Sequence, residues 1–216
     1  MRATLEPRKK IRLEWFSLKD VPFEIKRTVE VKYTVMTAQS NELTHSGKQE
    51  HIFKNITKEI PQTDLILLEY GLPTLFTKTS GSIGDKITSE KINDSTISIK
   101  DKLIKVDRGK EEIRREPPEF PDPKVKEIET RTRKDIIKRK ISVKNESNRR
   151  IDECKIVFIE VKQVRFDSSN PEPEKIDLPE YHWSISLDPD ETKSIELTMS
   201  VEIVKTFKIE KEKKES

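Results

Sequence analysis

The residues best suited to metal chemistry are the three histidines and the single cysteine, which are His45, His51, His182 and Cys154. Zinc sites place such ligands at short, fixed spacings. No pair here has that spacing, since the closest two, His45 and His51, lie six residues apart around Gly47. We therefore predict no metal site, and we interpret the histidines as surface or strand residues.

Nucleophilic and phosphate-binding motifs are also missing from the sequence. There is no G-x-S-x-G turn to expose a serine, and Cys154 opens an apolar stretch in which a thiol acts as a small hydrophobic residue. Gly81 and Gly84 are not followed by the Gly-Lys-Ser/Thr of a phosphate loop. Carboxylates are abundant, but two Trp, three Tyr and eight Phe are few for a sugar-binding cleft. We predict no catalytic residues, no cofactor and a non-enzymatic function.

Charge is distributed unevenly along the second half of the chain. Residues 131–150 hold nine basic side chains against two acidic ones, whereas residues 167–191 hold eight acidic side chains against one basic. The basic set is the candidate binding patch: Arg131, Arg133, Lys134, Lys138, Arg139, Lys140, Lys144, Arg149 and Arg150.

Three interpretations of this asymmetry remain open. The simplest is a solvated surface on which acids and bases compensate each other. Opposite patches also suit docking of a protein partner or self-association. The third interpretation is binding of nucleic acid or another anionic surface. The basic segment lacks the interleaved aromatic residues that stack on bases, which argues against it.

The overall composition limits the class of protein. Hydrophobic residues make up 32% and charged residues 38% of the chain, against roughly 45–50% and 25% in typical globular chains. Because the net charge is only +3 and isoleucine is frequent, we predict a folded, ion-pair-rich protein with a thermophile-like composition rather than a disordered chain. One cysteine excludes a disulfide framework, and apolar runs of four residues are too short for a membrane-spanning helix. No signal-peptide pattern is visible, which together with the single cysteine favours the cytoplasm.

Alternation of apolar and polar residues dominates the pattern and predicts strands. It is clearest at residues 29–35, 183–187 and 195–203, and a continuous apolar run at 156–159 predicts a more central strand. Helical patterns are weak and lie in Lys- and Glu-rich stretches near residues 110–116 and 207–216. We predict an all-β protein of two β-sandwich domains. Its core includes Ile156, Phe158, Trp183, Ile185, Leu187, Ile195, Leu197 and Val201.

The end of the chain resembles a known hairpin. Trp183 opens the pattern W-x-I-x-L-x-P-x-E, which runs through Asp188 to Glu191 and is followed by an alternating strand. This pattern resembles the final hairpin of many immunoglobulin-like sandwich domains. More narrowly, residues 96–212 resemble the C-terminal part of the DUF4139 family, the mucoidy-inhibitor-like proteins of unknown function. The chain departs from that family by lacking its long coiled coil and by having Asp190 in place of a glycine. The resemblance implies a sandwich fold and carries over no catalytic residues.

The proline-rich sequence PPEFPDP sets the predicted domain boundary, since it does not fit a sheet interior. We predict an N-terminal β domain at 1–106, a Pro-rich junction at 107–124, an immunoglobulin-like sandwich at 125–210 and a charged tail at 211–216. The predicted function is a non-catalytic structural or protein-interaction module. The alternative is nucleic-acid or anionic-surface binding through residues 131–150.

Overall fold

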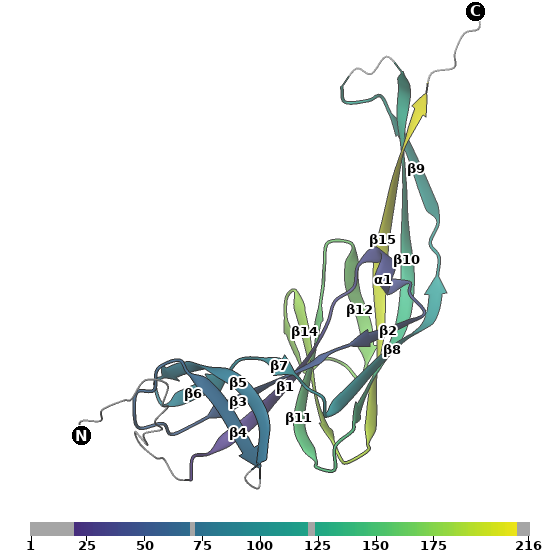
Figure 1. The fold of residues 1–216 in the computed structure, drawn as a ribbon. Coiled ribbons are helices and arrows are strands. Elements are labelled where there is room, and N and C mark those ends of the chain that lie inside the picture. Colours follow the sequence, from purple (N-terminus) through teal and green to yellow (C-terminus); the bar gives the residue numbers. More distant parts are fainter. Residues whose placement is uncertain (1–19, 70–71, 121–123, 211–216) are drawn as a thin grey trace, which may run out of the picture. The chain divides into compact units, whose positions relative to one another are not determined.

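The computed structural model describes residues 20–69, 72–120 and 124–210 (Figure 1). Strands account for most of this part of the chain, and its one helix, α1 (Val35–Ala38), has four residues. The described strands form two sheets. The predicted all-β fold built from sheets is therefore confirmed.

The chain divides into two compact units, and neither is a continuous stretch of sequence. Unit 1 consists of Met1–Ile25 and His51–Glu90, and unit 2 consists of Lys26–Glu50 and Lys91–Ser216. This differs from the predicted division at residues 107–124. Strand pairing between distant parts of the chain determines the division, and no local signal in the sequence reports such pairing.

Unit 1 contains a short run of antiparallel strands. The order is β3 (Gly47–Phe53), β6 (Lys86–Ser89), β5 (Leu72–Ile83) and β4 (Asp64–Glu69). The last residues of β3 pair with β6, β6 pairs with β5, and β5 pairs with β4.

Hairpin β4–β5 carries a four-residue apolar run, at residues 65–68, of which Ile66 and Leu68 are exposed. Ile66 lies directly opposite Phe76, and Leu68 lies opposite Pro73. Ile66, Leu68 and Phe76 are all exposed. The apolar run at 65–68 is thus not part of the main core.

Unit 2 contains two sheets. The first pairs β1 with β11 in parallel and β11 with β14 antiparallel. Its strands, in order, are β13 (Lys175–Asp177), β14 (Glu180–Leu187), β11 (Ile151–Ile159) and β1 (Phe23–Val31). The short strand β7 (Ile92–Asn93) pairs with the beginning of β3. The second sheet contains, in order, β12 (Val164–Asn170), β15 (Thr192–Glu210), β10 (Val125–Asn145), β8 (Ile97–Asp107) and β2 (Glu42–His45), and β9 (Glu111–Glu116) pairs with β10.

The hydrophobic core of unit 2 is made by alternate residues of these strands, whose inward-facing side chains form one cluster. Seven of the eight predicted core residues are buried, and Ile185 packs against the cluster half-buried. Period-two alternation therefore located the core correctly, because every second residue of a half-buried strand faces the same side.

The turn between β14 and β15 contains Asp190, the aspartate that stands in place of a glycine in the final hairpin. Asp190 has a φ of 60°, in the left-handed region that glycine and, less often, Asp or Asn adopt. The Glu191 side chain accepts a hydrogen bond of 2.7 Å from the Asp188 backbone N–H and closes the turn. An aspartate thus adopts here a conformation that usually favours glycine.

Candidate functional site

Three strands of unit 2 continue beyond its core as a ribbon, which we call the arm (Figure 1). The arm consists of β9, residues 125–134 of β10 and residues 202–210 of β15. β10 is its central strand, because β9 pairs along one side of it and β15 along the other. The predicted junction at 107–124 thus includes a paired strand, and its prolines follow that strand.

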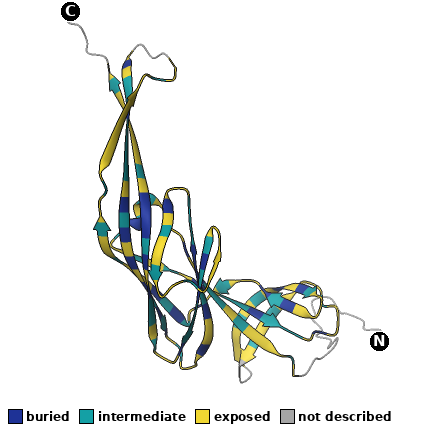
Figure 2. Cartoon of the chain, turned by 180° about the vertical axis from the view of Figure 1, so that it is seen from behind, coloured by how far each residue is buried: buried dark blue, intermediate teal, exposed yellow. Residues whose placement is uncertain are grey.

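Burial shows that the two outer strands of the arm are uncovered on both faces. The core part of β15 is largely buried, with Met199, Ser200 and Val201 buried in succession, but residues 204–208 are exposed without interruption. All six residues of β9 are exposed as well (Figure 2). A sheet with one covered face would bury every second residue. The two outer strands of the arm therefore present both of their faces to solvent, whereas Val125 and Glu129 of the central strand are buried.

The arm is held together by ion pairs around one carboxylate. Glu129 accepts hydrogen bonds from Arg131 Nε at 2.7 Å and from Arg115 Nε at 2.8 Å. These two guanidinium groups lower the pKa of Glu129. The Arg131 guanidinium also lies 5.0 Å from the ring centroid of Phe207 on β15, at a distance suited to a cation–π interaction. One cluster thus links all three strands of the arm.

The predicted basic patch is divided among different surfaces. Arg139 is completely buried, which excludes it from any exposed patch. Arg131 lies on one face of β10 beside Glu129, and Arg133 on the same face is ion-paired with the buried carboxylate of Asp135. The positive charges of Arg131 and Arg133 are therefore each balanced by a neighbouring carboxylate.

The remaining members of the set are exposed or half-buried on other surfaces. Lys134, Lys138 and Lys140 are exposed on the opposite face of β10. Lys144 forms an ion pair of 2.8 Å with Glu146. Arg149 and Arg150 are exposed before β11, and Arg150 lies 3.3 Å from the acidic residue Asp188. The structure therefore places four of the nine side chains, the lysines of β10, on one face of that strand, and three of them are exposed.

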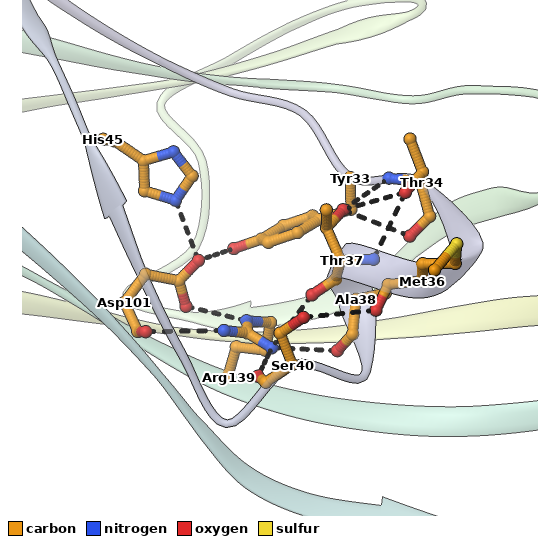
Figure 3. A network of polar contacts seen from close by, with 9 residues as sticks. All are labelled: Tyr33, Thr34, Met36, Thr37, Ala38, Ser40, His45, Asp101 and Arg139. Carbon is orange, nitrogen blue, oxygen red and sulfur yellow. Dashed lines mark hydrogen bonds and ion pairs between the residues drawn. The ribbon is translucent and has the colours of Figure 1, made fainter.

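Arg139 belongs to a buried polar network that joins β10, β8 and α1 (Figure 3). Its Nε donates a hydrogen bond of 2.7 Å to Asp101 Oδ1, and both side chains have no exposed surface. Its Nη1 donates to the carbonyl oxygens of Ala38 and Ser40 at 2.9 and 2.7 Å. Because a helix end leaves its last carbonyls without internal donors, Arg139 satisfies groups that would otherwise be buried and unpaired.

The other oxygen of Asp101 is satisfied from β1 and β2. The hydroxyl of Tyr33, two residues after the end of β1, donates a hydrogen bond of 2.7 Å to Oδ2, and His45 Nε2 lies 2.8 Å from the same oxygen. Burial alone would raise the pKa of Asp101, but hydrogen bonds from His45, Tyr33 and Arg139 together lower it. Burial and the Asp101 carboxylate raise the pKa of Tyr33 far above its ordinary value. The network is thus an ionised, buried anchor that fixes α1 to the second sheet.

Sequence reasoning did not find this network, although the sequence contains a signal for it. Asp101 follows Ile97 and Ile99 at the next inward position of its strand, and Arg139 lies between Ile137 and Ile141 in the same way. A charged residue at an inward position of an alternating strand predicts a buried partner of opposite charge. The identity of the partner could not be read from the sequence, because the two residues lie 38 positions apart.

Other chemically capable groups do not form a site in the described part of the chain. Burial raises the pKa of Cys154 to about 12, so its thiol stays protonated. No three His, Cys, Asp or Glu side chains gather as a metal site among these residues. A hollow of about 480 Å³ on β1, β11 and β14 is lined by both lysines and glutamates.

No described helix is long and apolar enough to cross a membrane. Comparison of the chain with family models, with curated proteins and with solved structures finds no match.

Proposed function

We propose that this protein is a non-catalytic interaction module whose binding element is the arm. The observation that carries the proposal is the uninterrupted exposure of residues 204–208 and of β9 on a ribbon that extends past the core. The arm adds surface without adding to the core of unit 2, which suits a role in contacting another molecule.

The energetics of the arm support this proposal. A small sheet gains independent stability by packing one hydrophobic face against something, and the two outer strands of the arm lack such cover on both faces. Three apolar side chains nevertheless lie exposed on it: Ile113 at 54%, Val204 at 45% and Phe207 at 44%. Apolar groups on a charged, solvent-exposed ribbon are typical of a surface that a partner covers.

The immunoglobulin-like character of the C-terminal half and its resemblance to DUF4139 proteins belong to the same proposal. Two packed sheets and a final hairpin with Trp183 at its base are compatible with both. Immunoglobulin-like sandwiches act through loops and strand edges on a rigid core. A thermophilic origin would suit the ion pairs of the arm, since charged networks contribute more at high temperature.

A capture experiment with matched variants tests the proposal. The variant I113K/V204K places charge on two exposed arm positions and should keep the far-UV circular dichroism spectrum and melting temperature of the wild type, because surface substitutions usually cost less than about 0.5 kcal/mol. Immobilised wild type is expected to retain a protein partner, including untagged copies of its own chain. The arm variant should retain at least about tenfold less, which corresponds to about 1.4 kcal/mol.

The control is I176K, whose residue on β13 is 55% exposed but lies outside the arm. This variant should retain as much partner as the wild type. Equal retention by I113K/V204K would contradict the proposal. Binding of a labelled mixed-sequence DNA duplex that weakens steeply with salt and is lost in R131Q/R133Q would replace it with the nucleic-acid alternative.

A further inference from the structure

The outer edge of β15 in the arm has backbone groups that no described strand pairs. β12 covers this edge only as far as Val201, and the Glu202 N–H donates its bond of 2.9 Å to the Gln163 carbonyl on that side. In an antiparallel strand, alternate residues direct both N–H and C=O to the same side. The backbone groups of Val204, Thr206, Lys208 and Glu210 therefore point outward. They form an open edge of the kind that accepts another strand.

We propose that a second copy of this chain occupies that edge, pairing β15 with β15 antiparallel about a two-fold axis. This inference rests on the proposed function and names the partner of the arm. A strand pairing with itself is isologous, so one open edge on each copy is sufficient and the assembly closes as a dimer. The two arms then form one continuous six-stranded ribbon.

Among the described residues of the edge, only one register satisfies all the outward groups without a clash. With Phe207 on the two-fold axis, Val204 pairs with Glu210 and Thr206 pairs with Lys208 of the second copy. Every outward group from Val204 to Glu210 is then bonded, and no like charges lie directly opposite each other.

The neighbouring registers are less favourable. Centring the pair on Thr206 places the second copy's Glu210 opposite Glu202, where Gln163 already lies. Centring it on Lys208 places two lysines directly opposite each other, which is destabilising. The position at which β12 stops therefore selects the register centred on Phe207.

The side chain of Phe207 fits this role. Its N–H points toward β10, so Phe207 faces its copy at a non-hydrogen-bonded position, where Cα atoms approach to about 4.5 Å. Aromatic pairs are favourable at such positions. The Arg131 guanidinium, 5.0 Å from the ring centroid, holds the ring from the adjacent strand of its own copy. Because edge pairing buries little area, the dimer is expected to be weak and concentration-dependent.

Cysteine cross-linking tests the register. In the Phe207→Cys variant, the Cα atoms of the two cysteines lie within the range that a disulfide requires, about 4.4–6.8 Å. Mild oxidation should therefore yield a covalent dimer of twice the 25.3 kDa monomer mass. Ile113→Cys on β9 is a control of similar exposure on the other edge of the arm, and it should stay monomeric. The native Cys154 is buried and does not compete. Equal cross-linking of the two variants, or none in Phe207→Cys, would overturn the register.

Proline substitution tests the edge itself. Thr206→Pro removes an outward N–H, which an edge strand tolerates. The variant should keep the melting temperature of the wild type while losing the concentration-dependent dimer in sedimentation velocity. Lys205→Pro removes an inward N–H that bonds to β10, so it should instead lower the melting temperature.

The outcomes separate this inference from the proposed function. Wild-type protein that stays monomeric at every concentration overturns the second copy as partner, and loss of capture by I113K/V204K would then still support the arm as a binding element. A wild-type dimer that Thr206→Pro leaves intact overturns the edge as the contact.

Discussion

Replacing Arg139 with methionine is expected to lower the free energy of unfolding by about 3–5 kcal/mol, the usual cost of removing one partner of a buried ion pair. Met fills part of the space but leaves the Asp101 carboxylate with only Tyr33 and His45. It also removes the donor to the Ala38 and Ser40 carbonyls. Denaturant unfolding followed by circular dichroism measures the loss. Since small proteins are stable by only about 5–15 kcal/mol, it is a large fraction of the total.

The matched control is Lys140→Met on the same strand, because Lys140 is exposed on the opposite face of β10. It should change the free energy of unfolding by less than about 0.5 kcal/mol. The double variant D101N/R139M should lose less than the sum of the two single losses, since it leaves no buried charge unpaired.

The pH dependence gives an independent readout of the same anchor. The folded-state pKa of Asp101 is lowered, so its contribution is present above the unfolded value of about 3.9 and is lost as the pH falls through the folded value. An unfolding energy for Arg139→Met equal to that of Lys140→Met would contradict the anchor.

Replacing Trp183 with alanine is expected to cost about 3–5 kcal/mol, as large-to-small changes of buried aromatic residues do. Trp183 is 3% exposed in the core of unit 2. Its ring lies 6.2 Å from that of Phe166, and its Nε1–H donates a hydrogen bond of 3.0 Å to the Pro171 carbonyl. The substitution therefore creates a cavity and removes one of the two donors to the Pro171 carbonyl, which also accepts a hydrogen bond of 2.7 Å from the Ser169 hydroxyl. The midpoint of denaturant unfolding should fall accordingly.

Two further variants separate these contributions. Trp183→Phe keeps an aromatic ring but loses the Nε1 donor, so its cost should fall between those of the wild type and Trp183→Ala. Ile176→Ala removes an apolar residue that is 55% exposed and should have little effect. An unchanged unfolding midpoint for Trp183→Ala would show that the core does not depend on this ring.

The sequence predicted the core of unit 2 well, because period-two alternation reports directly which side chains share a face. Trp183, Ile195 and Leu197 were found in this way and are buried. The four-residue apolar run at residues 65–68 shows the limit of that reasoning. Hydrophobicity alone does not say whether a hairpin lies within a core, and Ile66 and Leu68 are exposed.

The arm and the buried network could not be predicted, because both depend on pairing between distant segments. Residues 110–116 suggested weak helix because they are rich in charged side chains, yet β9 is a strand paired with β10. The charge count over residues 131–150 treated Arg139 and Lys140 alike, although Arg139 is buried and Lys140 is exposed. The density of basic residues along the sequence thus predicted one patch, whereas the fold distributes these side chains over several surfaces.

Amide hydrogen exchange along β15, measured by NMR at two protein concentrations, tests most directly whether a second copy pairs with the open edge of the arm. The amides of Lys205 and Phe207 point toward β10 and should be protected equally at both concentrations. The amides of Val204, Thr206 and Lys208 point to the open edge, and their protection should rise with concentration as a second strand pairs there. Exchange of these three amides that stays fast and independent of concentration would contradict the account.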